Sequence, residues 1–284
     1  MEIHRPVVSF LIPFASQKVK SDWGTACDQL KQTLESIRGS LSPNYTVVVI
    51  GHEQPDFNVE LDSRFKFISL NHDVNTGSDP VIAGRSDVIK KLDIGFKYAV
   101  ENWNPLYVMR CDADDLISNK LVDWLENAPS APGFLINRGW VWDQSKYFIQ
   151  YSETHDRICG TCLVIRSDYA DKEGPFLTDV DGITLTEEQR IFVQENQNSI
   201  VPGAKNGLLL LNNAHQRYTA YFKYLGVEIK RVPFEAVIYR ICNRDSLSKF
   251  DKNKGRKYTV RQYIGKLRRM RLITNKLKKE FSIL

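Results

Sequence analysis

The amino-acid sequence predicts an α/β fold with a mostly parallel central sheet, flanking helices and a basic helical tail at the C-terminal end. Strand patterns alternate with helix patterns through the first half of the chain, which is typical of parallel sheets. Charge is unevenly distributed, because residues 249–284 contain thirteen Lys or Arg and two acidic residues, while the net charge of all 284 residues is +5. The rest of the chain is therefore mildly acidic, and the tail is expected to contact something negatively charged.

Short apolar runs between turn residues predict the strands of the first half. They are Val7–Ile12, Tyr45–Ile50, Phe65–Leu70 and Leu106–Cys111. Apolar residues that recur every three or four positions predict helices at Cys27–Ile37 and Ser86–Val100, and Ser118 is expected to cap a third helix. Because ligands bind beyond the carboxyl ends of the strands in such sheets, residues that follow these strands are candidates for a site.

The second half is less regular and is assigned to the same domain. Strands are expected at Phe134–Asn137, Tyr147–Tyr151, Cys162–Ile165, Val227–Val232 and Ala236–Ile241, and helices at Glu187–Val193 and Gln216–Leu225. Trp140 and Trp142 connect the first two strands and are expected to pack in the core, or to form a platform for a sugar ring if exposed. We therefore expect a domain of residues 1–248, with halves 1–117 and 118–248, and a tail of residues 249–284.

Composition excludes several classes of protein. No apolar run approaches the ~18 residues that span a bilayer, and no secretory signal is recognised. Five cysteines in a chain of this length argue against a disulfide framework and for a reducing compartment. Cys159 and Cys162 lack a second pair, so a zinc site is not expected there. We expect a cytoplasmic protein, peripheral at the inner face of a membrane if the tail binds lipid.

The run Cys111-Asp112-Ala113-Asp114-Asp115 follows the fourth strand directly. Side chains alternate along a strand, so Arg110, Asp112 and Asp114 are expected on one side of it. Two convergent carboxylates can bind Mn²⁺ or Mg²⁺, which then complete their shell with phosphate oxygens and water. In the alternative interpretation, the aspartates only cap a turn and Arg110 forms an ion pair with one of them instead of contacting a diphosphate. Three aspartates at a strand end favour the metal–phosphate site.

With these motifs in place, the chain resembles glycosyltransferases of the GT-A fold, closest to the family-2-like group. The matching segments are the opening strand Ser9–Phe14, the helix Lys91–Ala99, the D-x-D-D run Asp112–Asp115, the acceptor-side strand Gly160–Ser167 and the closing run Tyr221–Arg240. The resemblance covers roughly residues 7–248. Each motif alone is weak, but five in the right order are fairly specific.

The resemblance implies transfer of a sugar from a nucleotide-diphosphate donor, with a UDP-sugar favoured, to a hydroxyl of a glycan or lipid-linked acceptor. Donor-binding positions carried over from the family are Pro13, Phe14, Glu53, Lys91, Asp93, Arg110 and Asp112. The Mn²⁺ or Mg²⁺ is assigned to Asp112 and Asp114. The chain departs from the family after the second strand, where Gly51-His52-Glu53 replaces a more acidic run.

The catalytic base is the main departure from the family. Its usual Glu-Asp pair falls on Ala214-His215, although an acceptor hydroxyl needs a base to take its proton. His215 could serve as that base, could bind the metal, or could be a structural helix residue. Acidic residues of the preceding segment are substitutes, and of Asp179, Asp181 and Glu188 we assign Glu188 as the second catalytic candidate.

Other functions are weaker matches to the sequence. A haloacid-dehalogenase-type phosphatase would place its D-x-D on the first strand with a following Thr, whereas Leu116 follows here. A sugar-nucleotide pyrophosphorylase would need a Gly-rich, Arg-bearing loop after the first strand, which the chain lacks. A non-enzymatic protein that binds nucleic acid or another anionic surface through the basic tail is the alternative in a different class, but no basic groove supports it and no nucleic acid is expected.

The tail combines basic residues with an apolar stripe. The stripe consists of Val260, Tyr263, Ile264, Leu267, Met270, Ile273, Leu277 and Phe281. This spacing predicts an amphipathic helix, which would lie on an anionic membrane surface or dock on the acidic body of the protein.

Overall fold

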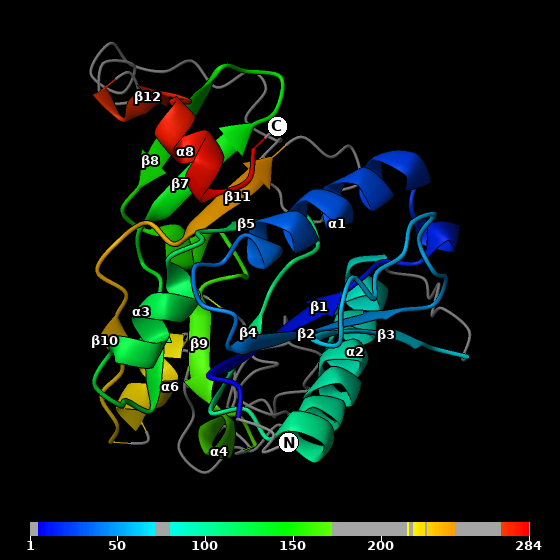
Figure 1. Cartoon of the computed structure of the whole chain (residues 1–284), viewed down its shortest axis with the longest axis horizontal. Coiled ribbons are helices and arrows are strands. Elements are labelled where there is room, and N and C mark those ends of the chain that lie inside the picture. The colour runs from blue at the N-terminus through cyan, green and yellow to red at the C-terminus, as the bar shows by residue number, and fades with distance from the viewer. Residues whose placement is uncertain are drawn as a thin grey trace, which may run out of the picture.

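The computed structural model describes residues 5–71, 80–171, 215, 218–224, 226–241 and 268–283 of the chain. Two sheets lie side by side with helices around them (Figure 1). One cluster of buried apolar side chains extends from the larger sheet into the smaller one, because it includes Phe10 and Val47 of the first and Val141 and Val237 of the second. The two sheets therefore share a core.

The larger sheet confirms the expected mostly parallel arrangement. Its order is β10-β6-β9-β4-β1-β2-β3. The strands are β1 (Val8–Pro13), β2 (Tyr45–Gly51), β3 (Phe65–Ser69), β4 (Tyr107–Arg110), β6 (Gly133–Leu135), β9 (Leu163–Arg166) and β10 (Lys230–Arg231). Strand β9 alone runs antiparallel to its neighbours β4 and β6, and the other pairs are parallel. The carboxyl ends of β1, β2 and β4 therefore meet at one edge.

Two long helices cover opposite faces of this sheet, as Figure 1 shows. The helix α1 (Trp23–Arg38) packs with Phe10 and Val47, whereas α2 (Pro80–Trp103) packs with Leu11 and Val48. Successive strand side chains point to opposite faces, which explains this division. The α/β class with flanking helices is thus confirmed.

A glycine lets α2 approach the sheet closely. A Cβ atom at Gly95 would stand 2.6 Å from Cδ1 of Ile50, a side chain of β2. A substitution at Gly95 would force the helix away from the sheet, since real Cβ contacts are longer. This close packing fixes α2 relative to the ends of β1 and β2.

The second half forms a sheet where the sequence predicted separate strands. Its order is β12-β8-β7-β11-β5, with β5 (Leu116–Ile117), β7 (Gly139–Asp143), β8 (Phe148–Ser152), β11 (Val237–Ile241) and β12 (Met270–Leu272). Trp140 and Trp142, expected in a connection, lie in β7, and both pack beside Leu277 and Ile283. The short helices are η1 (Gln17–Val19), α3 (Leu121–Asn127), η2 (His155–Arg157), α4 (Ser167–Ala170) and α6 (Tyr218–Tyr224). The predicted helix Glu187–Val193 lies outside the described residues.

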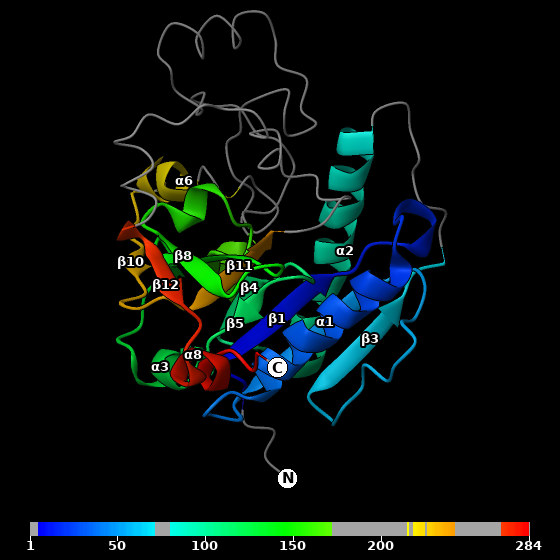
Figure 2. The same cartoon turned by 90° about the horizontal axis from the view of Figure 1, so that it is seen from above.

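The prediction of one amphipathic helix through the tail is wrong for residues 268–283. These residues form β12, which pairs antiparallel with β8, and a short helix α8 (Asn275–Glu280) capped by Thr274 (Figure 2). The three-and-four spacing of apolar residues could not reveal the strand, because backbone pairing with β8 outweighs local helix preference here. Residues 249–267 of the tail lie outside the described residues.

The end of the chain is packed on the body. Phe281 is fully buried beside Leu116 and Ile238. Glu280 accepts a hydrogen bond of 2.7 Å from the Ser118 hydroxyl and forms an ion pair of 2.5 Å with Lys120. Within the described parts of the chain, no helix has the length and apolar character that crossing a membrane requires.

We predict that Phe281→Ala lowers the free energy of unfolding by about 3–5 kcal/mol, because it removes a buried aromatic ring and leaves a cavity. Denaturation in urea measures this change. Leu272→Ala is the control, because Leu272 lies nearby in the sequence and is 72% exposed. Equal stability of the two variants would show that the C-terminal segment is not part of the core.

Candidate functional site

The aspartate run forms a turn at the carboxyl end of β4. The backbone N–H of Asp115 donates to the carbonyl of Asp112 at 3.1 Å, and β4 itself ends at Arg110. The prediction that strand alternation aligns Arg110, Asp112 and Asp114 is therefore wrong, because the aspartates are not in the strand. The turn places the three carboxyl groups close to one another by a different route.

Asp112 is held by Arg110 and by the segment before β9. The Nε and Nη2 atoms of Arg110 both lie 2.9 Å from Oδ1 of Asp112, which confirms the alternative that Arg110 forms an ion pair with an aspartate. The backbone N–H of Asp112 donates to the hydroxyl of Thr161 at 2.8 Å. A Cβ atom at Gly160 would stand 2.6 Å from Oδ2 of Asp112, so only glycine fits there without displacing the carboxylate.

Asp115 carries a buried carboxyl group that holds the turn to the segment before β9. It accepts hydrogen bonds from the Thr161 hydroxyl at 2.5 Å and from the Cys159 thiol at 3.2 Å. Burial raises the pKa of Asp115 well above its ordinary value, and the neighbouring charges of Asp114 and Asp112 raise it further. The protonated form is thus favoured in the folded protein. Thr161 links Asp115 to Asp112 through one hydroxyl.

The guanidinium group of Arg240 joins the turn to α1. Its Nε donates to the carbonyl of Asp114, its Nη1 to Oε1 of Gln32 at 2.6 Å, and its Nη2 to the carbonyl of Gln29 at 2.8 Å. The Thr33 hydroxyl lies 3.0 Å from the same Nη2 and donates to the carbonyl of Ala113 at 2.9 Å. The turn is therefore fixed by β11 and α1 together.

Asp112 and Asp114 supply two negative charges that suit a divalent cation, but they provide only part of its coordination shell. Burial and the charge of Asp112 raise the pKa of Asp114, while the guanidinium of Arg240 lowers it. A cation between the two carboxylates would relieve their repulsion. Among the described residues, however, no three His, Cys, Asp or Glu side chains are grouped to hold a metal ion. Phosphate oxygens and water would have to supply the remaining ligands.

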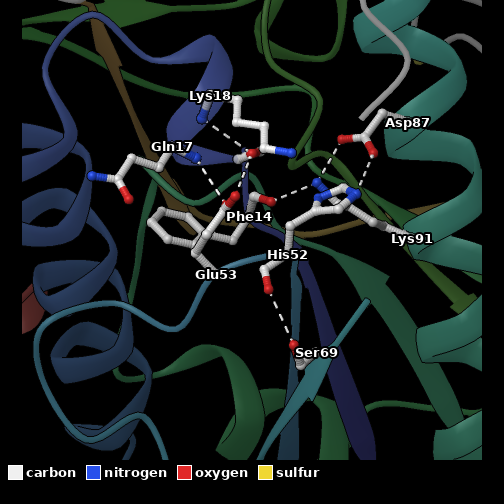
Figure 3. Close-up of polar contacts among 9 residues, drawn as sticks. Phe14, Gln17, Lys18, His52, Glu53, Ser69, Asp87 and Lys91 are labelled. Atoms are coloured by element: carbon white, nitrogen blue, oxygen red, sulfur yellow. Dashed lines mark hydrogen bonds and ion pairs between the residues drawn. The ribbon is translucent and has the colours of Figure 1, made fainter. Parts of the chain in front are cut away.

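A second polar cluster lies at the ends of β1 and β2 (Figure 3). Glu53 accepts hydrogen bonds from the Ser16 hydroxyl and the backbone N–H of Gln17, both at 2.9 Å. Burial alone would raise the pKa of Glu53, but these hydrogen bonds and the nearby His52 lower it overall. Glu53 is therefore ionised at neutral pH and tied to the loop that follows β1.

Lys91 of α2 is buried in the same cluster. Its Nζ donates to the carbonyl of Phe14 at 2.7 Å and to Asp87 at 2.5 Å, as the dashed lines of Figure 3 show. Burial lowers the pKa of Lys91, and Asp87 opposes that shift. Asp87 also lies 3.8 Å from Nε2 of His52. Lys91 thus links the end of β1 to α2. Of its two partners, Phe14 was a predicted donor residue and Asp87 was not.

The remaining predicted donor residues lie in two environments. Pro13 ends β1 and is buried opposite Ile50, and the ring of Phe14 packs on Trp23 with centroids 5.0 Å apart. Asp93 is half-buried in α2. Two residues along a helix correspond to a rotation of about 200°, so Asp93 does not share the face of Lys91. Glu188 lies outside the described residues, as do Asp179 and Asp181.

His215 approaches the aspartate turn from a distant part of the sequence. Its Nδ1 lies 2.7 Å from the carbonyl oxygen of Asp156. Since a carbonyl only accepts, Nδ1 carries the proton and Nε2 is the basic nitrogen. Burial lowers the pKa of His215, and the charges of Arg110 and Asp112 also influence it, the first lowering and the second raising it. A neutral His215 close to the Arg110–Asp112 pair fits a base. As a metal ligand it was expected to act with Asp112 and Asp114, but these three described residues do not form a group that could hold a metal ion.

Sequence reasoning missed the residues that position the site. Thr161 and Arg240 belonged to matched motifs without a stated role, and Asp87 was overlooked. Asp87 had a recognisable signal, because it precedes Lys91 by four residues on a predicted helix and opposite charges at that spacing face each other. No sequence signal pointed to the partners of Arg240, since Gln29 and Gln32 are about 200 residues away.

Comparisons with known proteins give low similarity. No family model matches the chain, and no curated protein matches it. Among solved structures, residues 1–349 of TarS from S. aureus share 12% identity at a TM-score of 0.41 over 82% of this chain. A nucleotide-diphospho-sugar transferase of Desulfovibrio desulfuricans G20 shares 14% sequence identity at a TM-score of 0.35. The match covers 93% of this chain and 94% of that protein. The apo form of the glycosyltransferase GlyE of Streptococcus pneumoniae TIGR4 shares 9% sequence identity at a TM-score of 0.37 over 88% of this chain.

The chain spans 60% of the TarS structure and 59% of the GlyE structure. The function proposed for this chain depends on its own residues.

We predict that Thr161→Val destabilises the protein by about 1–3 kcal/mol, because it leaves the backbone N–H of Asp112 and the carboxyl of Asp115 without their shared partner. Thr161→Ser keeps the hydroxyl and is the matched control. Urea denaturation compares the two. A serine variant as unstable as the valine variant would contradict the prediction, because keeping the hydroxyl would then not preserve stability.

We predict that stability falls as the pH decreases below about 6.5, in part because of His155. Burial, followed by the charge of His215, lowers the pKa of His155 from 6.5 to about 3. Below pH 6.5 the unfolded chain binds a proton at this ring and the folded protein does not. The free energy of unfolding therefore falls by up to about 1.4 kcal/mol per pH unit, down to pH 3.

His155→Phe keeps a flat ring against Gly139, where a Cβ would stand 2.6 Å from the His155 ring. The free energy of unfolding, measured by denaturation between pH 4 and pH 8, should therefore change less with pH in this variant. An identical pH dependence in both proteins would contradict a buried neutral His155.

Proposed function

We propose that the chain is a metal-dependent glycosyltransferase that moves a sugar, a hexose in the favoured case, from a nucleotide-diphosphate donor to a hydroxyl acceptor. A UDP-sugar is the favoured donor, and a glycan or lipid-linked molecule the favoured acceptor. The observation that carries this proposal is the turn Asp112–Asp115 at the carboxyl end of β4, fixed on both sides by Thr161 and Arg240. In open α/β sheets this edge is where nucleotide ligands bind.

Two clusters at one sheet edge divide the work of donor binding. The cluster of Glu53 and Lys91 lies at the ends of β1 and β2, and the aspartate turn follows β4, which pairs with β1. We assign the nucleoside end of the donor to the first cluster, since the half-buried carboxylate of Glu53 offers hydrogen-bond acceptors there. We assign the diphosphate to the turn.

Asp112 and Asp114 would hold the Mn²⁺ or Mg²⁺, which supplies positive charge for the diphosphate as it leaves. Arg110 offers a second positive group at the same place. Its guanidinium is paired with Asp112 at 2.9 Å and could turn part of its donor set to a phosphate oxygen. The turn therefore combines carboxylates for a cation with a guanidinium for an anion.

Transfer also requires deprotonation of the acceptor. As the acceptor oxygen forms its bond to the anomeric carbon, the bond from that carbon to the diphosphate breaks and the acceptor proton must leave. We assign the proton to Nε2 of His215, the basic nitrogen of a ring held by Asp156. Glu188 stays an alternative base, and His215 stays an alternative metal ligand.

His215→Ala separates the two roles. Loss of a base slows sugar transfer while donor affinity stays nearly unchanged, because the proton moves only in the transition state. Loss of a metal ligand weakens Mn²⁺-dependent donor binding, and added Mn²⁺ partly restores the rate. Transfer at the wild-type rate with limiting Mn²⁺ would exclude both roles.

We predict that Asp114→Asn lowers donor hydrolysis or transfer at least ~100-fold, because it removes one charge from the cation and keeps the shape of the turn. The assay is release of the nucleoside diphosphate from a panel of nucleotide sugars with Mn²⁺. Donor binding is followed separately by thermal shift.

Asp123→Asn is the matched control, because this exposed aspartate of α3 loses the same charge away from the turn. Unchanged turnover in Asp114→Asn, or full activity of the wild type in excess EDTA, would contradict the proposed site.

A further inference from the structure

The edge of the smaller sheet carries an exposed apolar pair. Tyr147 is 89% exposed and Leu272 is 72% exposed, and in the described part of the chain no other large apolar side chain is as exposed as either. The two come from distant parts of the sequence. Strand pairing brings their backbones together, because Leu272 lies opposite Phe148 and the backbone N–H of Ile273 donates to the carbonyl of Tyr147 at 3.2 Å. Successive side chains alternate along a strand, so Leu272 and Tyr147 lie at the same open edge of the sheet and project from its two faces.

A dense positive charge accompanies this pair. The described C-terminal segment 268–283 carries six exposed basic side chains, namely Arg268, Arg269, Arg271, Lys276, Lys278 and Lys279. Its one acidic residue, Glu280, is engaged by Ser118 and Lys120 of the body. Beside Tyr147, Lys146 is exposed and its ion pair with Asp143 leaves no excess negative charge there. The segment that carries Leu272 is therefore strongly basic.

Strand β12 is placed at the open edge of its sheet. Among the described strands it pairs with β8 alone, and Figure 2 shows it at the margin of the molecule. Edge strands commonly carry charges that prevent pairing with other chains. Basic charge alone would serve that purpose, whereas an exposed leucine beside an exposed tyrosine works against it. The apolar pair needs another explanation.

We propose that β12, α8 and the loop before β8 form a surface that binds anionic phospholipid membranes. Lys and Arg near a membrane surface are attracted to anionic headgroups, and this attraction weakens with salt. Tyrosine suits the boundary between headgroups and acyl chains, because its ring is apolar and its hydroxyl is polar. Leu272 enters the apolar layer of the membrane, where its exposed side chain is removed from water. The apolar pair distinguishes this surface from one built for a nucleic acid backbone alone.

This surface differs from the amphipathic helix that the sequence predicts. Leu277 and Phe281 of the predicted stripe pack on the body, and the membrane-facing residues are Tyr147 and Leu272 instead. The inference stands on these exposed side chains and does not require the proposed transferase activity. It would bring the enzyme to a lipid-linked acceptor if that activity is correct.

The test is co-sedimentation of the full chain with vesicles of phosphatidylcholine, with and without 30% phosphatidylglycerol. We expect binding to the anionic vesicles, at least tenfold weaker binding to phosphatidylcholine alone, and loss of binding in 0.5 M NaCl. The double variant Tyr147→Ser, Leu272→Asn should bind at least fivefold more weakly at low salt. Both side chains are exposed, so the fold should be unaffected.

Charge is tested with a matched pair of triple variants. Arg268→Gln, Lys276→Gln and Lys279→Gln together should weaken binding at least tenfold. Lys31→Gln, Lys97→Gln and Lys223→Gln remove the same net charge from exposed positions on α1, α2 and α6, and should leave binding within twofold of the wild type. Equal loss in both triple variants would overturn the proposal, because net charge alone would then explain binding.

Two further results would also overturn it. One is the absence of wild-type binding to anionic vesicles. The other is tighter binding to single-stranded RNA than to vesicles, with that binding unchanged in the Tyr147→Ser, Leu272→Asn variant. The second result would identify the surface as a nucleic-acid site. Donor binding measured by thermal shift in the same variants reports the transferase separately, so failure of one proposal is distinguishable from failure of the other.

Discussion

The buried guanidinium of Arg240 is the interaction on which the arrangement of the site depends. It comes from β11 of the smaller sheet, binds two turns of α1 through Gln29 and Gln32, and donates to the carbonyl of Asp114. A charge that is 2% exposed is costly unless its hydrogen bonds are satisfied, so the three elements must meet correctly before the cost of burial is offset. The same contact that joins the two sheets therefore also sets the position of the aspartate turn.

The turn itself is held by opposite kinds of group on its two sides. On one side, Thr161 and Cys159 donate to Asp115, a buried carboxyl whose raised pKa favours the protonated form. On the other side, Arg110 neutralises Asp112, which is more accessible. Environment thus separates two aspartates that are three residues apart: Asp115 is buried in the support of the turn, and Asp112 is the accessible one, to which we assign ligand binding. Such separation is what a site for a charged diphosphate needs, because a rigid support keeps the ionised carboxylates in place.

The C-terminal segment connects the fold to a surface. Phe281 and Glu280 fasten α8 to β5 and α3, and this anchoring allows β12 to extend the smaller sheet. The extension leaves Leu272 beside Tyr147 at an open edge with basic residues around them. The segment thus combines a buried anchor, which contributes to stability, with exposed side chains, which we propose contact a membrane.

The sequence by itself determined the α/β class, the strands and helices of the first half, and the place of the aspartates, because each depends on local patterns: apolar runs, helical spacing, and a polar run after a strand. Only the tertiary structure decided what the aspartates touch. Arg240 meets α1 across about 200 residues, Thr161 reaches Asp112 and Asp115 from the segment before β9, and His215 reaches the turn from a separate segment. The tail shows the same limit, since Met270–Leu272 lie in a stretch of helical spacing but form a strand where β8 offers its backbone groups. Local spacing records which residues are apolar, whereas pairing and burial depend on what the rest of the chain brings alongside.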